Sequence, residues 1–355
     1  MKKVKIHLLG FLYKSVRFLV TKLLYFFQKI TFQKKDLEPA VAVGDYALSL
    51  FFPLRSIFYN FKIPSKINVE IFNLDFKSPL IGSSFKSDEN IISIWLEMGI
   101  GGVVLKTIMR DQRIGNEAPR LQETNINGVK GLVNSLGLPG DGIKQYSIKL
   151  ENSKIWDYDV PVGISIGGND VDEYLYNISF LESIFLSKRK SYFYELNVSC
   201  PNINNGRSLG ENPEELENML KQIKKISDVP LSIKVSPDWD NKILKLIGEI
   251  CRDNDKVLIN AGNTQFKTTK ELKLKINRLS TNGGGFSGES IFNRTLEMVK
   301  LFSIFKIPII ATGGVNNIEQ IRILKKEGAS LYGMATSLIF NPYCIPKINH
   351  SFKNV

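Results

Sequence analysis

A thiol and two carboxamides lie within a span of six residues, at Asn197, Cys200 and Asn202. The residues at 194–198 have the aromatic and aliphatic composition of a buried strand, and Pro201 would end that strand. A thiol can exchange a proton through its thiolate, and carboxamides both donate and accept hydrogen bonds. This segment is therefore suited to holding a small, polar, planar molecule while one proton moves. The competing interpretation is that Cys200 is a small buried apolar residue and that the asparagines form a turn.

Two lysines end other predicted strands. Lys106 follows the apolar and glycine-containing run 99–105, and Lys234 ends the run 231–234. A lysine that points into the mouth of a barrel needs an anion or a carbonyl as partner, because an unpaired charge is costly there. An exposed, solvated side chain is the alternative for Lys106.

Further amides accompany these lysines. Asn134 lies in a compact loop shaped by glycine and proline, and Asn263 follows another predicted strand, next to Thr264. With Asn197 and Asn202 they make four amides, a set that fits a ring with alternating N–H and C=O groups. Such a site would reject ligands without those groups, because buried amides would be left unpaired.

Three glycine-rich motifs occur toward the C-terminus, at 283–288, 311–314 and 333–337. We expect them to be loops after late strands, where glycines let backbone N–H groups approach a phosphate. No G-x-G-x-x-G motif follows an early strand, so the sequence does not indicate a nicotinamide dinucleotide fold.

The elements that must position these residues are short strands alternating with amphipathic helical stretches. This order predicts an α/β fold, a (β/α)8 TIM barrel with a small helical N-terminal extension, and a doubly wound open sheet is the second choice. In a barrel the functional residues lie at the C-terminal ends of the strands, as the motifs above do. The predicted strands are 79–82, 102–106, 162–166, 194–198, 231–235, 256–260, 308–312 and 331–334.

The composition is that of a globular protein, with 43% hydrophobic and 23% charged residues among 355. The three cysteines form no C-x-x-C pair, and both histidines, His7 and His350, lie near the termini. We therefore expect no metal site, no iron–sulfur cluster held by this chain alone and no histidine base. An odd number of cysteines suits a reducing compartment.

Positive charge is concentrated at the N-terminus. Residues 1–35 contain nine lysines and arginines and no acid, so only +3 of the net charge of +12 belongs to the other 320 residues. This segment is rich in Leu and Phe, but basic residues interrupt each apolar run before it reaches the length of a membrane span. We predict a basic amphipathic helix in a membrane interface and no nucleic-acid partner. A secretory signal and a helix packed on the protein's own surface are the alternatives.

Three segments follow from these patterns. We assign 1–35 to the membrane-interface helix, 36–66 to a short helical segment and linker, and 67–355 to the barrel. The middle segment starts with an acidic residue and a proline close together, Asp36 and Pro39, and Pro53 and Pro64 bound its linker.

The motifs resemble those of the dihydroorotate dehydrogenases, over roughly residues 67–345. Asn197-x-x-Cys200-Pro201-Asn202 is similar to the active-site loop of this family, and four further segments follow in the family's order. The resemblance implies FMN, which a single phosphate site suits better than a dinucleotide, and oxidation of (S)-dihydroorotate to orotate in pyrimidine biosynthesis, with Cys200 as the catalytic base. It implies substrate contacts from Asn134, Asn197, Asn202, Asn263, Thr264 and Lys106. The cofactor contacts that it implies are Ser83, Ser84, Lys106, Thr107, Lys234, Asn260, Gly288, Gly313, Gly314, Ala335 and Thr336.

The resemblance combines features of two classes. Cys200, Lys106 and the Asn134 loop look like class 1, whose members pass electrons to fumarate or to a partner subunit. The first 66 residues resemble, more weakly, the helical domain with which class 2 members bind a quinone. We expect a peripheral protein on the cytoplasmic face of the cell membrane that reduces a quinone. A cytoplasmic enzyme with fumarate or another soluble acceptor is the alternative.

Two other functions stay open. The dihydropyrimidine dehydrogenases share the Asn-x-x-Cys-Pro frame, but they typically carry His at the position of Asn202 and need cluster cysteines that this chain lacks. A flavin-binding membrane protein without catalysis would have no need of Cys200 as a base. For the oligomeric state we allow for a homodimer.

Overall fold

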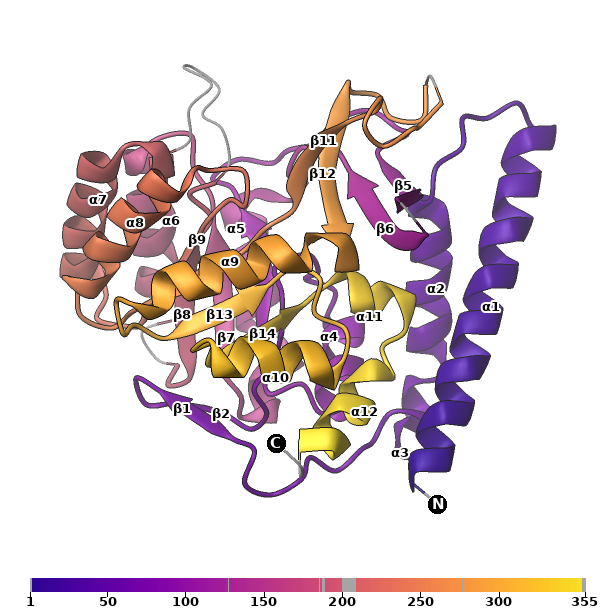
Figure 1. Cartoon of the computed structure of the whole chain (residues 1–355), viewed down its shortest axis with the longest axis horizontal. Coiled ribbons are helices and arrows are strands. Elements are labelled where there is room, and N and C mark those ends of the chain that lie inside the picture. The colour runs from indigo at the N-terminus through magenta and orange to yellow at the C-terminus, as the bar shows by residue number, and fades with distance from the viewer. Residues whose placement is uncertain are drawn as a thin grey trace.

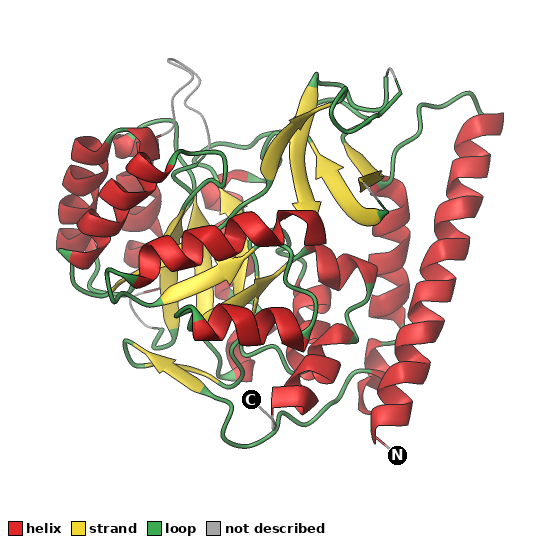
Figure 2. Cartoon of the chain, viewed as in Figure 1, coloured by secondary structure: helices red, strands yellow, loops and turns green. Residues whose placement is uncertain are grey.

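The computed structural model of the chain describes residues 2–126, 128–184, 186, 189–199, 209–275 and 277–352. Eight parallel strands close into a barrel in the order β10-β13-β14-β3-β4-β7-β8-β9, surrounded by helices (Figure 1 and Figure 2). The predicted TIM barrel is therefore confirmed. Its strands are β3 (Leu80–Gly82), β4 (Gly102–Ile108), β7 (Val162–Ile166), β8 (Tyr192–Leu196), β9 (Leu231–Lys234), β10 (Val257–Ala261), β13 (Ile309–Thr312) and β14 (Leu331–Met334).

All eight predicted strands are present, with bounds that differ from the prediction by at most two residues. The strand β8 ends two residues earlier than predicted, because it spans Tyr192–Leu196 and not 194–198. Asn197 therefore begins the loop after the strand.

Amphipathic helices cover the barrel because each buries one apolar stripe. In α8 (Asn241–Arg252) the buried residues are Leu244, Ile247, Gly248 and Cys251, at helical spacing, and the Asp240 side chain caps the first turn. The other barrel helices are α4 (Glu89–Glu97), α5 (Gly142–Glu151), α6 (Val171–Ile184), α7 (Pro213–Ile226), α9 (Phe292–Ser303) and α10 (Ile318–Lys326), and α11 (Thr336–Phe340) and α12 (Cys344–Ser351) follow the last strand.

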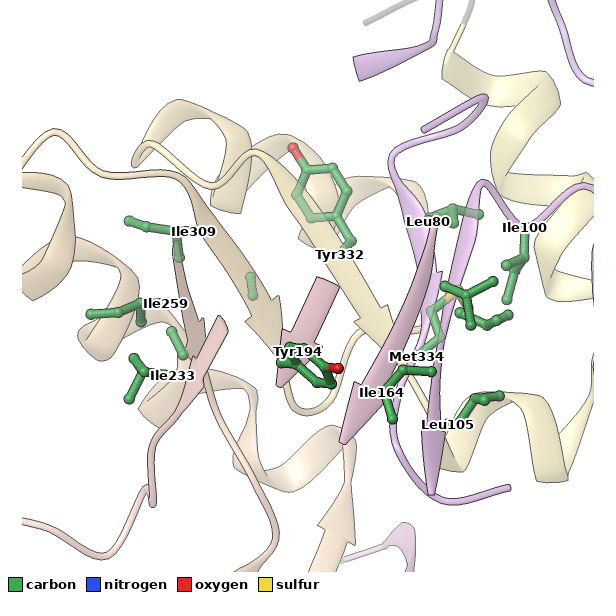
Figure 3. Packing of buried hydrophobic residues seen from close by; sticks show 14 of the residues in the cluster. Leu80, Ile100, Leu105, Ile164, Tyr194, Ile233, Ile259, Ile309, Tyr332 and Met334 are labelled. Carbon is green, nitrogen blue, oxygen red and sulfur yellow. The ribbon is translucent and has the colours of Figure 1, made fainter. Parts of the chain in front are cut away.

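The apolar core has two layers. The outer layer lies between strands and helices, and Figure 3 shows some of its members, among them Ile164, Ile233 and Ile309. The inner layer fills the barrel itself, and the hairpin of β1 (Val69–Ile71) and β2 (Leu74–Phe76) packs against it. The opposite, C-terminal end of the barrel is thus the end that is left for a ligand.

A four-stranded antiparallel sheet, which was not predicted, lies over that C-terminal end (top of Figure 1). The prediction that 283–288 is a loop is wrong, because these residues form the strand β12. Its glycines let neighbouring strands come close: a Cβ on Gly284 would lie 2.4 Å from the backbone oxygen of Asn134. The strands, in spatial order, are β11 (Gln265–Thr268), β12 (Gly283–Gly288), β6 (Val129–Asn134) and β5 (Leu121–Ile126).

The N-terminal extension is helical, as expected, and packs on the flank of the barrel (right of Figure 1). It consists of α1 (Lys2–Ile30), α2 (Glu38–Leu50), a 3-10 turn (Phe52–Leu54) and α3 (Arg55–Phe58). Tyr13 of α1 donates a hydrogen bond to the Ile339 backbone at 3.1 Å, and Arg17 pairs with Glu123 at 3.0 Å.

The connection between α1 and α2 is tied to the antiparallel sheet. The Leu37 backbone N–H donates to Leu121 of the edge strand β5 at 3.0 Å, and Glu38 accepts two hydrogen bonds from Arg120 at 2.7 and 2.9 Å. This connection covers the edge of the sheet, which would otherwise present unpaired backbone groups.

One face of α1 remains exposed although the helix packs on the protein. Its exposed apolar residues are Val4, Leu8, Phe11, Leu12, Val16, Phe18, Leu19, Leu23, Phe26, Phe27 and Ile30. Within the described residues no single helix is long and apolar enough to cross a membrane, although α2 together with Phe52–Phe58, bent by 50°, meets the length and composition for a span.

Candidate active site

A cleft of about 1510 Å³ opens at the C-terminal end of the barrel, with the antiparallel sheet as one wall. It brings together predicted residues from distant parts of the chain. The predicted residues that line it are Ser83, Ser84, Lys106, Thr107, Asn134, Asn197, Lys234, Asn263, Thr264, Gly288, Gly313, Gly314, Ala335 and Thr336. Cys200 and Asn202 lie outside the described residues.

A chain of hydrogen bonds connects two of the predicted amides. Asn197 donates to Thr107 Oγ1 at 3.1 Å and accepts from Ser199 at 2.9 Å, and Asn263 donates to Ser199 Oγ at 2.7 Å. The Thr107 hydroxyl is itself 3.0 Å from Ser165 Oγ. Each amide is thereby held in one orientation.

Asn134, the amide from the opposite wall, lies at the end of β6 and donates to the Gly285 backbone at 3.3 Å. Lys106 is near it and donates from Nζ to the Pro139 backbone oxygen at 2.7 Å. Burial, and then the charge of Arg120, lower the pKa of the half-buried Lys106 ammonium below its usual value. A ligand carboxylate would compensate this desolvation, so Lys106 favours an anionic substrate.

A second polar network lies deeper, around a carboxylate that is completely buried. Glu195 accepts from Asn260 at 2.7 Å, and its other oxygen is 3.9 Å from Lys234 Nζ. Lys234 in turn donates to Ser84 Oγ at 2.8 Å, on the loop after β3. Asn260 is 1% exposed and does not line the cleft, so it supports Glu195 from behind.

The sequence analysis did not single out Ser165, Ser199 or Glu195. Ser165 and Glu195 lie inside the strands Val162–Ile166 and Tyr192–Leu196, in which every residue is buried. A polar residue within an otherwise apolar strand was the available signal, since buried polar groups need partners.

The end of the cleft near β13 and β14 has the properties of a phosphate and flavin site. Gly313 and Gly314 have φ of +128° and +76°, and a Cβ on Gly314 would lie 2.9 Å from the Phe292 backbone nitrogen. The hydroxyls of Ser83, Thr312 and Ser337 line the cleft and are buried without a hydrogen-bond partner among the described residues. Unpaired buried hydroxyls beside a close backbone turn fit the phosphate and polar ring edge of FMN.

Cys344 also lines the cleft, a residue that the sequence analysis left aside. Burial raises the pKa of its thiol to about 12. At neutral pH it is therefore a neutral thiol and a poor candidate for a base.

A second cavity, of about 280 Å³ and mainly apolar, lies between the N-terminal helices and the barrel. Leu9, Leu12 and Val16 of α1 form one wall, and Val41 and Leu48 of α2 form another. The β3–α4 loop separates the two cavities, because Phe85 of this loop lines both of them. A molecule in the apolar cavity would therefore be separated from the cleft by this loop alone.

Comparison with known proteins identifies the family. The model of the family described as dihydroorotate dehydrogenase matches residues 66–355. The catalytic subunit of dihydroorotate dehydrogenase B (NAD(+)) from Bacillus pumilus is 31% identical over 297 residues, which cover 81% of this chain and 91% of the relative. The corresponding subunit from Malacoplasma penetrans is 28% identical over 289 residues, or 80% and 90%.

Among solved structures, dihydroorotate dehydrogenase from Eimeria tenella, in complex with ferulenol, has the same fold. The TM-score is 0.72 at 17% sequence identity, with 88% of this chain and 90% of that chain covered. The chain belongs to the dihydroorotate dehydrogenase family and is an oxidoreductase with FMN as its cofactor.

Proposed function

We propose that the protein oxidises (S)-dihydroorotate to orotate and passes the electrons to a membrane quinone. The observation that supports the substrate best is the hydrogen-bonded chain from Thr107 through Asn197 and Ser199 to Asn263, in a cleft that Lys106 also lines. Oriented amides together with a cation match a ring of alternating N–H and C=O groups with a carboxylate.

The chain's own residues bind the ring and move one proton. Asn134, Asn197, Asn202 and Asn263, with Thr264, hold the ring, and Lys106 binds its carboxylate. Cys200, as thiolate, removes a proton from one ring carbon, while the adjacent carbon loses a hydride and the C=C bond forms. FMN, when bound, would supply the hydride acceptor, and Lys234 would be the cation that offsets negative charge on it.

The cofactor is held by groups from several strand ends. Ser83 and Ser84 follow β3, and Lys106 and Thr107 lie near the end of β4. Gly313, Gly314, Ala335 and Thr336 would hold the phosphate, together with Gly288 at the end of β12, since all five line the cleft. Asn260 acts indirectly, through Glu195 and Lys234.

The apolar cavity supports a quinone as the electron acceptor. Its lining is mainly aliphatic and aromatic, and it shares Phe85 with the flavin cleft. The named relatives use NAD(+), but the family match begins at residue 66, so α1 and α2, which form one side of this cavity, lie outside the matched part. NAD(+), fumarate or another soluble acceptor is the alternative.

Charge and exposure support a peripheral position on the cytoplasmic face of the membrane. The exposed apolar residues of α1 are accompanied by the exposed lysines Lys3, Lys14, Lys22, Lys29 and Lys34. An apolar face flanked by cations is suited to an anionic bilayer surface, at about 1 kcal/mol for each basic residue near it.

Replacing Cys200 by Ser should slow the reduction of FMN by dihydroorotate about 100-fold or more, because an alcohol is a far weaker base than a thiolate. Stopped-flow absorbance at about 450 nm, where oxidised flavin absorbs, measures this step. The wild-type rate should rise with pH as the thiolate forms, since an ordinary thiol titrates near pH 8.5. Cys251→Ala, which removes a thiol from the core, should reduce flavin at the wild-type rate. An unchanged rate in Cys200→Ser would exclude Cys200 as the base.

The affinity for orotate should fall as pH rises through the lowered pKa of Lys106, because only the protonated ammonium attracts the carboxylate. The fall should therefore begin at a lower pH than for an ordinary lysine. Lys106→Met should bind orotate about tenfold or more weakly at neutral pH, and Lys106→Arg should bind it without this pH dependence. Titrating the flavin spectrum with orotate gives the dissociation constants. Identical pH profiles for the wild type and Lys106→Met would contradict the assignment.

The full chain should float with vesicles that contain phosphatidylglycerol, and less so at high salt. Phe11→Glu combined with Leu19→Glu should abolish flotation, because these side chains are 63% and 57% exposed and make the apolar face. Ile304→Glu, at an equally exposed position on the barrel (64%), should float like the wild type. If the wild type does not float with the vesicles at low salt, α1 packs only on the protein's own surface.

A further inference from the structure

We propose that the ion pair between Asp45 of α2 and Lys86 of the β3–α4 loop is the polar anchor for the acceptor's head group, with the Lys86 ammonium donating to one ring carbonyl. The ligand class is a planar ring with two carbonyl groups and an apolar tail. This inference rests on the proposed quinone reaction and assigns it a binding residue.

The pair stands out because the rest of the cavity is mainly apolar. Three charged side chains among the described residues line it, namely Arg17, Asp45 and Lys86. Arg17 is directed to Glu123 at 3.0 Å and lies over the Phe340 ring, 4.6 Å from its centre. The Asp45–Lys86 pair is thus the ionic group that remains for a ligand.

Partial burial of this ion pair costs desolvation free energy, so the pair is a poor way to stabilise the contact between a helix and a loop. The side chains of Lys86 and Asp45 are 20% and 27% exposed, and apolar residues of similar size would often stabilise such a contact as well. An ammonium has three N–H donors, and the hydrogen bond to Asp45 uses one of them. The other two can serve a carbonyl oxygen, a polar group that a purely apolar lining could not satisfy.

The position of Lys86 orients the ligand. Lys86 follows Phe85, which lines both cavities, and its backbone oxygen accepts from the Lys106 backbone N–H at 3.0 Å. A ring bound to Lys86 is therefore adjacent to the loop that carries Ser83 and Ser84.

The other side of the cavity provides the path for the tail. Leu12, Val16, Val43 and Phe51 line the cavity and are also among the exposed apolar residues. A cavity of about 280 Å³ holds a ring with a short piece of tail, so the remainder must pass out between α1 and α2. That exit is bordered by the apolar residues of both helices, on the surface proposed to meet the membrane.

The test separates the two half-reactions. Enzyme reduced by one equivalent of dihydroorotate is mixed, without oxygen, with decylubiquinone, and flavin reoxidation is followed by stopped-flow absorbance. Lys86→Met should raise the half-saturating quinone concentration about tenfold or more, because a charge-assisted hydrogen bond is lost. Lys86→Arg keeps a cationic donor and should remain within about threefold of the wild type. Lys77→Met removes an ion pair with Asp159, which does not line the cavity, and should behave like the wild type.

A steric pair of variants tests the cavity independently. A Cβ on Gly44 would meet no heavy atom within 4 Å, and this residue lines the cavity. Gly44→Ala should therefore be close to wild type, whereas Gly44→Leu should raise the half-saturating quinone concentration by filling the space.

The outcomes distinguish this inference from the proposed function. If wild-type reduced flavin is not reoxidised by decylubiquinone, the quinone proposal itself fails. If the wild type is reoxidised but Lys86→Met and Lys86→Arg have equal half-saturating concentrations, only the anchor is refuted. If Lys86→Met instead loses FMN or slows flavin reduction by dihydroorotate, the pair has a structural role and the anchor is likewise refuted.

Discussion

The active site depends on one buried charge, the carboxylate of Glu195. It has no exposed surface, and a buried carboxylate is tolerated only with hydrogen-bonding and cationic partners, here Asn260 at 2.7 Å and Lys234 at 3.9 Å. Lys234 also donates to Ser84, so one ionic network joins the ends of β8, β9 and β10 to the loop after β3. Ser83 and Ser84 of this loop line the cleft, Lys86 lines the apolar cavity, and Phe85 lines both. The network around Glu195 therefore holds the loop that separates the two cavities.

The N-terminal extension adds to the barrel a cavity that the barrel alone would not enclose. The connection between α1 and α2 is hydrogen-bonded to the edge of the antiparallel sheet, and Asp45 pairs with Lys86 of the β3–α4 loop. The helix α1 consequently has two apolar sides. One side packs on α2, α11 and α12 through residues such as Ile6 and Tyr13, while the other remains exposed. Because one side packs on the protein and the other is exposed, Leu and Phe occur almost all around the helix. The same helix can therefore pack on the protein's own surface and also present an apolar side to a membrane interface.

Sequence patterns predicted the barrel because its strands are short, buried apolar runs that alternate with amphipathic helices. They did not reveal the antiparallel sheet, because β12 is built largely of glycine and has no alternating pattern, and its stability comes from pairing with strands far away in the sequence. Site residues at strand ends, such as Lys106 and Lys234, could be found since polar groups there interrupt apolar runs. Ser199 and Glu195 were missed because their roles depend on partners from other strands. A quinone-binding helical extension was expected only from the resemblance, because no motif encodes a space between helices.

We propose that the apolar cavity delivers a quinone to the reduced flavin. The most direct measurement is anaerobic turnover of dihydroorotate by the full chain, with decylubiquinone, fumarate or NAD+ supplied in turn as the electron acceptor. We predict that kcat/KM is at least about tenfold higher with the quinone than with either soluble acceptor, because only an apolar ligand gains from burial in this lining. Turnover with NAD+ or fumarate but not with the quinone would contradict the account.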